Sequence, residues 1–364
     1  MTGVLEGIRV LDFTWVVGGP LCTKYLAMLG AEVVKVESST RPEHRKRDGQ
    51  FELLNAGKYS CEVDLKSPSG RRHIRDLLAG SDILVENFGV GVMARLGLSY
   101  EQARVVRPDL IMLSLSGLGQ EGPDSSLLAY GSLIQSYAGW TSLLCEADDL
   151  ADDRLGMVPV WADHLAALMS TVAILAAVRR RAETGLGEYV DVSILECVVS
   201  MMPGQVSAAS QAATLRPMGN RSDRFAPHNV YPCAGTDRWI AIAAYDDDQW
   251  EALRRLVDLP EAGLSTVESR LARVAELDAA VTQWTRDQDP WKVQGRLRDA
   301  GVPAAVSRNL DDLLADAHLA ERTFFRAGAH GPGLGLPWLA ESNPPITRPA
   351  PQLGEHTTRY LEEM

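Results

Sequence analysis

The sequence lacks three features that would assign it to a special class of protein. No stretch approaches the roughly 18–20 unbroken apolar residues of a membrane-spanning helix. Its first residues lack the basic start and apolar core of a secretion signal. The five cysteines form no Cys-x-x-Cys pair and are odd in number, which favours reduced thiols over a disulfide framework. We therefore expect a cytoplasmic protein with no membrane partner and no metal site.

Basic charge is also scarce. The net charge of the 364 residues is −12, so nucleic acid is not an expected partner, because binding to phosphates needs a basic face. The segment 41–47 is a local exception, since it holds four cations in seven residues. Such a run is typical either of a solvated loop or of a site for an anionic ligand, and both interpretations stay open at this point.

Apolar strand patterns alternate with helical patterns over the first 120 residues. Strands are predicted at 8–13, 31–37, 60–65, 82–86 and 110–115, and helices at 21–29, 69–79 and 99–106. This alternation predicts a parallel sheet covered on both faces, with ligands bound at the carboxyl ends of the strands. Gly18 and Gly19 turn the chain after the first strand, and Pro20 suits the first position of the helix that follows.

The rest of the chain is organised differently. Residues 129–212 are mainly helical, with a long helix from Asp163 to Arg181 and a short strand at 188–192. A loop-rich stretch at 216–227 indicates a domain boundary. It precedes a smaller α/β pattern with strands at 238–243 and 303–306. The tail from about residue 335 is rich in proline and has no periodicity, so we expect it to gain its order by docking.

Asp163 is the most informative single residue. It is a lone carboxylate that opens a long apolar helix. The helix is too apolar to face water, so we expect the carboxylate to lie where a helix end enters a packed interior. An aspartate in that position is either a helix cap, worth about 1 kcal/mol, or a group with a chemical role. The residues by themselves favour the cap.

Seven motifs then identify a family resemblance. They occur in order at residues 5–13, 29–37, 55–66, 82–91, 114–123, 185–193 and 351–356. Together they resemble the class III CoA transferases, the family of formyl-CoA and carnitine CoA transferases and α-methylacyl-CoA racemase. The resemblance implies an α/β fold with a Rossmann-like large domain, a smaller α/β domain and an interlocked homodimer. We assign residues 1–215 to the large domain, 216–325 to the small domain, and 326–364 to a segment that returns to the large domain.

The resemblance also implies a catalytic role for Asp163. In the transferases of this family an aspartate at the start of this helix attacks the thioester of an acyl-CoA. The implied substrates are an acyl-CoA and a carboxylic acid acceptor, and no tightly bound cofactor is expected. His164 adjoins Asp163, but consecutive helical residues point about 100° apart, so we expect His164 to serve packing or to support groups that neighbour the site.

The matching positions predict where coenzyme A and the acyl group bind. The predicted CoA contacts are Val16, Val63, Lys66, Asn87, Phe88 and Arg95, with Arg41 of the basic segment in place of a family arginine that falls on Ser38. The predicted substrate pocket consists of Val17, Tyr130, Trp140, Gly219 and Asn220. Val17 replaces a glutamine of formyl-CoA transferase. Together with Trp15, Trp140 and Trp161, this favours a bulkier acyl group than formate or oxalate.

Three alternatives remain. An acyl-CoA racemase would need a histidine where this chain has Tyr130, and tyrosine, with a pKa of about 10, is a poor base near neutral pH. A nicotinamide-dependent oxidoreductase would explain Glu37 about twenty residues after Gly18, but the glycine fingerprint of that class is absent. The chain could also be a CoA-binding subunit of a heteromeric transferase.

Overall fold

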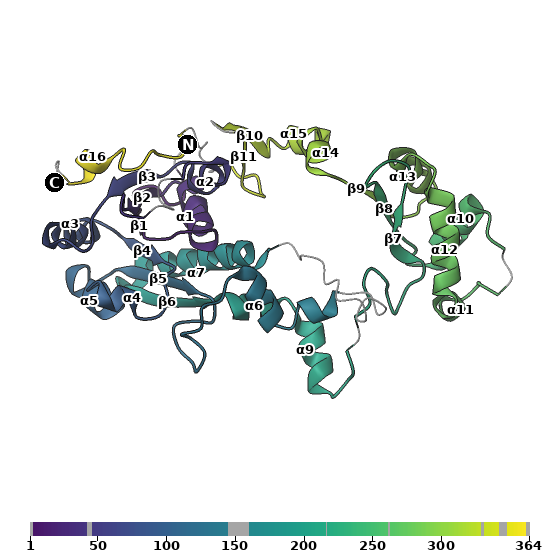
Figure 1. Cartoon of the computed structure of the whole chain (residues 1–364), viewed down its shortest axis with the longest axis horizontal. Helices are drawn as coiled ribbons and strands as arrows, with labels where there is room; N and C mark the ends of the chain where they lie inside the picture. The colour runs from purple at the N-terminus through teal and green to yellow at the C-terminus, as the bar shows by residue number, and fades with distance from the viewer. Residues whose placement is uncertain are drawn as a thin grey trace. The chain divides into compact units, whose positions relative to one another are not determined.

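The computed structural model describes residues 3–41, 46–144, 160–215, 217–260, 263–328, 331–341 and 348–361. The chain divides into two compact units, and Figure 1 labels their elements. Unit 1 consists of Met1–Thr141, Met157–Ala213 and Ala317–Met364, and unit 2 consists of Ser142–Gly156 and Thr214–Asp316. Both ends of the chain therefore belong to unit 1.

Unit 1 contains a six-stranded sheet in which all neighbouring strands are parallel. In spatial order the strands are β3 (Tyr59–Glu62), β2 (Glu32–Glu37), β1 (Arg9–Asp12), β4 (Ile83–Glu86), β5 (Ile111–Ser116) and β6 (Glu188–Ser193). The winding reverses at β1, where Val10 pairs with Val33 of β2 and with Ile83 of β4. The carboxyl ends of β1 and β4 flank this switch point, where ligands bind in open α/β sheets. The predicted α/β fold with a parallel sheet is confirmed.

Side chains alternate between the two faces of the sheet, and each face has its own apolar core. In β1, Val10 belongs to one core and Leu11 to the other, and Ile83 and Leu84 divide in the same way in β4. The first layer contains α1 (Gly18–Met28), α2 (Gly49–Asn55), α6 (Gly131–Tyr137), α7 (Ala162–Thr184) and α8 (Ile194–Ser200). The second layer contains α3 (Pro68–Ala79), α4 (Val92–Arg95), α5 (Tyr100–Val106) and α16 (Thr357–Leu361).

Local caps explain where several helices begin. The Ser67 hydroxyl accepts the backbone N–H of Gly70 at 2.9 Å and starts α3, and Ser99 starts α5 with a capping box. The predicted start of the first helix is wrong, because α1 begins at Gly18 rather than at residue 21. Pro20 lies in its first turn, where a missing N–H is tolerated because no acceptor precedes it in the helix.

Helix α7 has 23 residues and is long and apolar enough, by length and composition alone, to cross a membrane. Core helices of soluble proteins pass the same test, and here 39% of the most apolar window is buried inside the protein. Ala166 and Ile174 lie in the first-layer core, whereas Met169 and Val172 are exposed. The helix therefore has one face in the core and leaves an apolar face outside it.

The C-terminal segment docks on unit 1, as its lack of periodicity predicted. The backbone N–H of His356 donates to the carbonyl oxygen of Ser60 at 2.9 Å, and the Tyr360 hydroxyl donates to Glu32 at 2.6 Å. Tyr360 is buried in the second-layer core. The remaining elements of unit 1 are α9 (Pro203–Ser210), α15 (Ala317–Glu321), β10 (Phe325–Gly328) and β11 (Gly331–Leu334). A short 3-10 helix spans Thr141–Leu143.

Unit 2 has a three-stranded antiparallel sheet backed by helices. Its strands, in order, are β7 (His228–Pro232), β8 (Trp239–Ala243) and β9 (Ala304–Ser307). Its helices are α10 (Asp247–Val257), α11 (Val267–Ala272), α12 (Val274–Thr285), α13 (Pro290–Asp299) and α14 (Leu310–Leu314). Asp278 ties α12 to β7, because its carboxylate accepts the Tyr231 hydroxyl at 2.8 Å. The sequence had predicted two of these three strands and missed β7.

Candidate active site

Asp163 lies in the first turn of α7, beside the starts of two other first-layer helices. A methyl group added at Gly18, the first residue of α1, would lie 3.3 Å from its Oδ1 atom. A methyl group added at Gly131, the first residue of α6, would overlap with Oδ2 and with Val160. The carboxylate is therefore held between two glycines that lack the side chains to push it aside.

The interpretation of Asp163 as a simple helix cap is wrong. The N-cap residue of α7 is Trp161, two positions earlier. The backbone N–H groups of Trp161 and Ala162 donate instead to the side-chain oxygen of Gln135, at 3.1 and 3.4 Å. Because a side chain of α6 already caps α7, the carboxylate of Asp163 is available for another role.

Positive helix ends surround this carboxylate. None of the N-cap residues of α1, α6 and α7 forms a side-chain cap hydrogen bond. The N–H groups in the first turn of a helix have no partner within the helix, and the helix dipole adds partial positive charge there. The three helix starts can therefore stabilise negative charge at Asp163 and on a substrate oxygen beside it.

The half-buried position of Asp163 changes its acidity. Burial raises the pKa of the carboxyl group, and the neighbouring His164 lowers it by a smaller amount, so the net shift is upward. The side chain of His164 is exposed, so the prediction that His164 serves packing is wrong. A carboxylate with a raised pKa is a better nucleophile than an ordinary aspartate once it is ionised.

The loop after β1 is fixed from both sides. The Asn87 side chain accepts the backbone N–H of Trp15 at 3.0 Å and donates to the Trp15 carbonyl oxygen at 2.8 Å. The next residue, Val16, has φ of 66° and is 52% exposed. A β-branched residue with positive φ is strained, and such strain persists only where the surrounding contacts hold it. Asn87 thus holds the backbone of Trp15, directly before the exposed Val16.

A buried ionic cluster of Asp12, Lys35 and Lys58 also contacts the segment that follows β1. The Lys58 ammonium donates to Asp12 at 3.0 Å and to the carbonyl oxygen of Pro20 at 2.8 Å. The Lys35 ammonium donates to the carbonyl oxygen of Thr14 at 2.6 Å and lies 3.9 Å from Asp12. Both ends of the loop that carries Val16 and Gly18 are therefore bonded to buried cations.

The predicted CoA contacts divide into three environments. The Arg41 guanidinium lies 5.6 Å from the centre of the Trp15 ring and 6.0 Å from that of Phe88. Lys66 and Arg95 are exposed, on the loop after β3 and on α4. Val63 is only 3% exposed and packs in the second-layer core.

The structure divides the basic segment. Arg47 forms an ion pair with Glu37 at 2.9 Å and lies 4.0 Å from the centre of the Phe51 ring. Residues 42–45 of the predicted cluster lie outside the described residues. Within the described part of the segment, Arg41 is therefore the cation that faces the switch point, beside Trp15 and Phe88.

The predicted substrate residues of unit 1 surround the start of α7. Trp140 and Trp161 meet edge to face with ring centres 4.9 Å apart, and both pack against the first-layer core, as does Val17. Tyr130 is the N-cap residue of α6 and is 50% exposed. These side chains give the surroundings of Asp163 an apolar wall.

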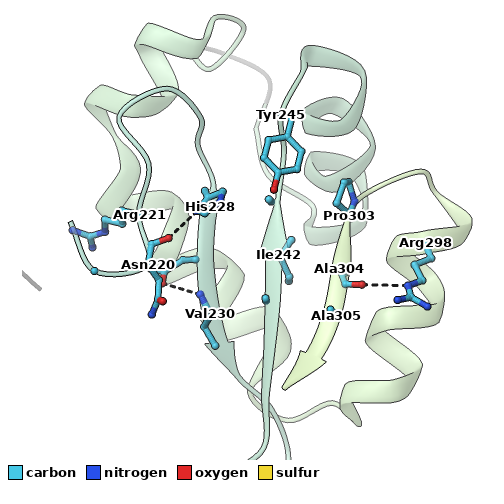
Figure 2. A pocket seen from close by; sticks show the side chains of 14 residues that line it. Asn220, Arg221, His228, Val230, Ile242, Tyr245, Arg298, Pro303, Ala304 and Ala305 are labelled. Carbon is cyan, nitrogen blue, oxygen red and sulfur yellow. Dashed lines mark hydrogen bonds between the residues drawn. The ribbon is translucent and has the colours of Figure 1, made fainter. Parts of the chain in front are cut away.

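Gly219 and Asn220 belong to unit 2 and line a pocket of about 700 Å³ over its sheet. Figure 2 shows Asn220 and His228 facing each other across one side of this pocket, where the His228 Nδ1 atom and the Asn220 carbonyl oxygen are 2.7 Å apart. Tyr245 stands over the end of β8, and Arg298 donates to the Ala304 carbonyl oxygen at 3.2 Å. The pocket thus combines an apolar sheet face with a few polar groups, which is typical of ligand sites.

The sequence analysis missed two residues of the site. Gly131 and Gln135 both lie on α6, about thirty residues before Asp163 in the chain. A glycine next to Tyr130 carried a weak signal, since glycine marks a close approach of backbone to another group. Gln135 carried none, because its capping role depends on the packing of α6 against α7. Within the described residues, no group of three or more His, Cys, Asp or Glu side chains is placed to hold a metal ion.

Comparisons with known proteins agree on one family. A model of CoA-transferase family III matches residues 5–357. A probable CoA-transferase of Mycobacterium tuberculosis is 31% identical over 366 residues, which cover 95% of this chain and 45% of that protein. The succinyl-CoA:mesaconate CoA-transferase of Haloarcula marismortui is 32% identical over 390 residues, which cover 99% of this chain and 96% of that protein.

Two further matches cover nearly the full length of both chains. The beta subunit of the succinyl-CoA–L-malate CoA-transferase of Chloroflexus aurantiacus is 29% identical over 382 residues, with 99% of this chain and 94% of that protein covered. A crystal structure of a CAIB/BAIF family protein from Brucella suis has a TM-score of 0.91 and 27% identity, with 100% of both chains covered. Family model, sequences and fold agree: this chain belongs to CoA-transferase family III and is an enzyme that transfers coenzyme A.

Proposed function

We propose that this enzyme transfers CoA from an acyl-CoA to a carboxylic acid and that Asp163 is the nucleophile. The observation that carries the proposal is the placement of its carboxylate. It is half-buried between Gly18 and Gly131, and it forms no ion pair with any side chain that the structure describes. Burial of a charged carboxylate without a cation partner destabilises the fold. A functional role would explain why an aspartate is present at this position.

The reaction consists of four exchanges at the Asp163 carboxyl group. The carboxylate attacks the thioester carbonyl of the donor, which forms an aspartyl–acyl anhydride and expels the CoA thiolate. The thiolate attacks the aspartyl carbonyl, which forms an aspartyl-CoA thioester and releases the donor acid. The acceptor carboxylate attacks that thioester and again expels the thiolate. The thiolate then attacks the acceptor's acyl carbon, which yields the new acyl-CoA and restores Asp163.

The helix starts supply the electrostatics of these steps. Each attack on a carbonyl group gathers negative charge on its oxygen, beside an N-terminal turn of α1 or α6. Preorganised N–H groups stabilise such a charge without having to reorient during the reaction. Covalent catalysis keeps the thioester energy, since no step uses water.

For the CoA moiety we propose the groups around the switch point. Val16 and Asn87 would shape the passage toward Asp163, and Arg41 with Phe88 would meet the nucleotide part. Arginine beside an aromatic ring can contact both a base and a phosphate. The acyl-CoA is a substrate here, rather than a resident cofactor.

For the acyl groups we propose succinyl-CoA as the first donor to test and small dicarboxylic acids as acceptors. Two relatives carry succinyl-CoA in their names. The apolar wall of Val17, Trp140 and Trp161 further favours an acceptor with a hydrocarbon portion over formate or oxalate.

We also propose that the active enzyme is a homodimer. Several large side chains with apolar surface are exposed on helices α6, α7 and α9 and just after α8, namely Leu133, Tyr137, Met169, Val172, Met201 and Val206. A second copy that is interlocked as the family resemblance implies would cover such a face. Sedimentation of the pure protein tests this, because a monomer, or activity only with a second chain type, would contradict it.

Trapping the intermediate tests the proposed function directly. The enzyme is incubated with succinyl-CoA, quenched with hydroxylamine and digested, and the peptides are analysed by mass spectrometry. We expect a hydroxamate on Asp163 and none in an Asp163→Asn variant treated in the same way. A modification at another residue, or transfer activity that survives in the variant, would contradict the assignment.

A further inference from the structure

A second anion-binding feature lies in unit 1 outside the site described so far. It is a pocket of about 210 Å³ on the second layer of the sheet. Three arginines of α3, Arg71, Arg72 and Arg75, line it together with an apolar floor. The floor consists of Leu65, Ile74, Leu96, Gly97 and Leu98. We call it the α3 arginine pocket.

The three arginines lack the acidic partners that several other described arginines of unit 1 have. Within the described residues, none of them forms an ion pair with a carboxylate. By contrast, Arg104 on α5 pairs with Glu101 at 3.7 Å, and Arg179 on α7 pairs with Glu183 at 2.6 Å. Like charges one turn apart on a helix repel one another. In a chain of net charge −12, a cluster of this kind is suited to an anion from outside.

The pocket adjoins the predicted CoA contacts. Leu65 lies in the loop after β3, next to Lys66, and the Arg71 guanidinium donates to the Lys66 carbonyl oxygen at 2.9 Å. Leu96 follows Arg95 at the end of α4. Both segments follow carboxyl ends of strands, so the pocket opens near the edge of the sheet where ligands bind.

The pocket and Asp163 lie on opposite layers of the sheet. Asp163 belongs to α7 in the first layer, whereas α3 and α4 cover the second. Phe88, which Arg41 faces, follows the carboxyl end of β4 and packs against the second-layer core. A ligand that reaches from Asp163 to the arginines must therefore be long, with its reactive group at one end and its anion at the other.

The size and chemistry of the pocket select one part of such a ligand. A volume of about 210 Å³ is below the roughly 300–1,000 Å³ of sites that enclose a whole ligand, so it fits one end of a longer molecule. Guanidinium groups bind phosphate through paired N–H donors, and the apolar floor suits the ribose that carries it. In acyl-CoA, the thioester is at one end and the adenosine 3′-phosphate at the other.

We propose that the α3 arginine pocket binds the adenosine 3′-phosphate of CoA through Arg72 and Arg75. These two arginines would set the preference of the enzyme for CoA over 3′-dephospho-CoA. The inference rests on the proposed function in one respect, which is that CoA is the ligand. It does not depend on the reaction at Asp163.

Binding of two probes tests this subsite. The affinities of CoA and of 3′-dephospho-CoA are measured by calorimetry with the full-length enzyme and with the double variant Arg72→Gln/Arg75→Gln. The wild-type enzyme is expected to prefer CoA by at least about 100-fold, because the contacts of two arginines with the 3′-phosphate are missing in 3′-dephospho-CoA. The variant is expected to bind both probes alike, at the wild-type affinity for 3′-dephospho-CoA.

The control removes the same charge elsewhere. The variant Arg104→Gln/Arg179→Gln should keep the wild-type preference, because both arginines are exposed and already paired with acids. The single variant Arg72→Lys keeps the charge but loses the paired donors, so it should show an intermediate preference even if the double variant folds poorly.

Two results would overturn the inference, and both differ from a failure of the proposed function. A wild-type enzyme without preference between the probes contradicts it, and so does a double variant that keeps the preference. If Asp163 is never acylated while the preference depends on Arg72 and Arg75, the pocket stands and the transfer mechanism falls.

Discussion

Two aspartates of unit 1 show how surroundings divide the same residue type between structure and chemistry. Asp12 ends β1 with its side chain buried and accepts hydrogen bonds from Lys58, Thr14 and Thr23. Burial alone would raise its pKa, but the charges of Lys35 and Lys58 and the hydroxyl hydrogen bonds outweigh it and lower the pKa to about 2. Asp163 has glycines in place of such partners, and burial raises its pKa.

The difference teaches which carboxylate is free to react. The oxygen atoms of Asp12 accept hydrogen bonds from Lys58 and from threonine hydroxyls. These bonds stabilise the fold and leave the Asp12 carboxylate unavailable to a substrate. Asp163 has a backbone hydrogen bond and the neighbouring His164 to stabilise its charge, but burial outweighs both and raises its pKa. The two residues are also connected through α1. Lys58 of the Asp12 cluster donates to the carbonyl oxygen of Pro20, two residues after the Gly18 that lies beside Asp163.

The largest expected effect is the loss of activity on replacement of Asp163. Asp163→Asn should lower kcat by at least ~10³-fold, because the nucleophile is gone. Its melting temperature should equal or exceed that of the wild-type enzyme near neutral pH, since a half-buried unpaired charge is removed. Steady-state assays with succinyl-CoA and a thermal melt check both points, and a variant that is both inactive and clearly destabilised would contradict the comparison.

The second prediction concerns stability. Asp12→Asn leaves the ammonium groups of Lys35 and Lys58 buried without their anion, so we expect a loss of about 3–5 kcal/mol in the free energy of unfolding. Chemical denaturation measures it. The control Glu101→Gln breaks the exposed pair with Arg104 and should cost less than about 1 kcal/mol. Equal losses in the free energy of unfolding of the two variants would contradict a special contribution of the Asp12 cluster to stability.

The third prediction compares the two glycines that hold Asp163. Gly131→Ala places a methyl group against Oδ2 and should lower kcat/KM by about 10²-fold, the usual result of displacing a reacting group by an ångström. Gly18→Ala meets Oδ1 at 3.3 Å, so its loss should be clearly smaller. Gly204→Ala on α9, where no atom lies within 4 Å, serves as control and should retain wild-type activity.

The smallest expected effect is on how stability depends on pH. The contributions of Asp12 and Asp163 to stability change with pH in opposite directions. The stability that Asp12 contributes is present above the ordinary pKa of 3.8 and is lost as pH falls toward about 2. Burial makes protonation of Asp163 easier in the folded chain than in the unfolded chain, so the relative stability that the protonated carboxyl group contributes is lost as pH rises through the raised pKa. The gain in melting temperature of Asp163→Asn should therefore shrink toward acid pH.

The same shift appears in the kinetics. Because only the ionised Asp163 attacks, the acid limb of the kcat/KM profile should lie above the range of an ordinary aspartate. A limb at or below an ordinary aspartate pKa, or a stability gain that grows toward acid pH, would contradict the raised pKa.

The sequence predicted the elements whose signals are local. The strands around Val10, Val33 and Ile83 have continuous apolar patterns, and Ser99 marks a helix start by its own chemistry. The start of α3 was predicted at residue 69, although Ser67 is its cap residue. The long helix after Asp163 and the docking of the tail were also predicted. The start of α1 was misplaced, because Gly18 and Gly19 are poor helix formers and only tertiary packing makes them helical.

The site was harder to predict, because its key contacts join distant segments. Capping of α7 by Gln135 depends on the packing of α6 against α7, which no periodicity reveals. The contact between Gly131 and Asp163 has the same origin. The strand β7 was missed because Pro232 and His228 interrupt the apolar pattern, while its Tyr231 is buried. The family resemblance suggested the proposed role of Asp163, and the packing around its carboxylate is compatible with that role.

Transfer of a heavy oxygen isotope from acceptor to enzyme tests the central claim most directly. In the proposed sequence, one carboxylate oxygen of the acceptor bridges the second anhydride and remains on Asp163 when the new acyl-CoA leaves. A single turnover with an acceptor labelled in its carboxylate should place the label in the peptide that contains Asp163 and in no other peptide. An active enzyme whose Asp163 stays unlabelled would contradict the account.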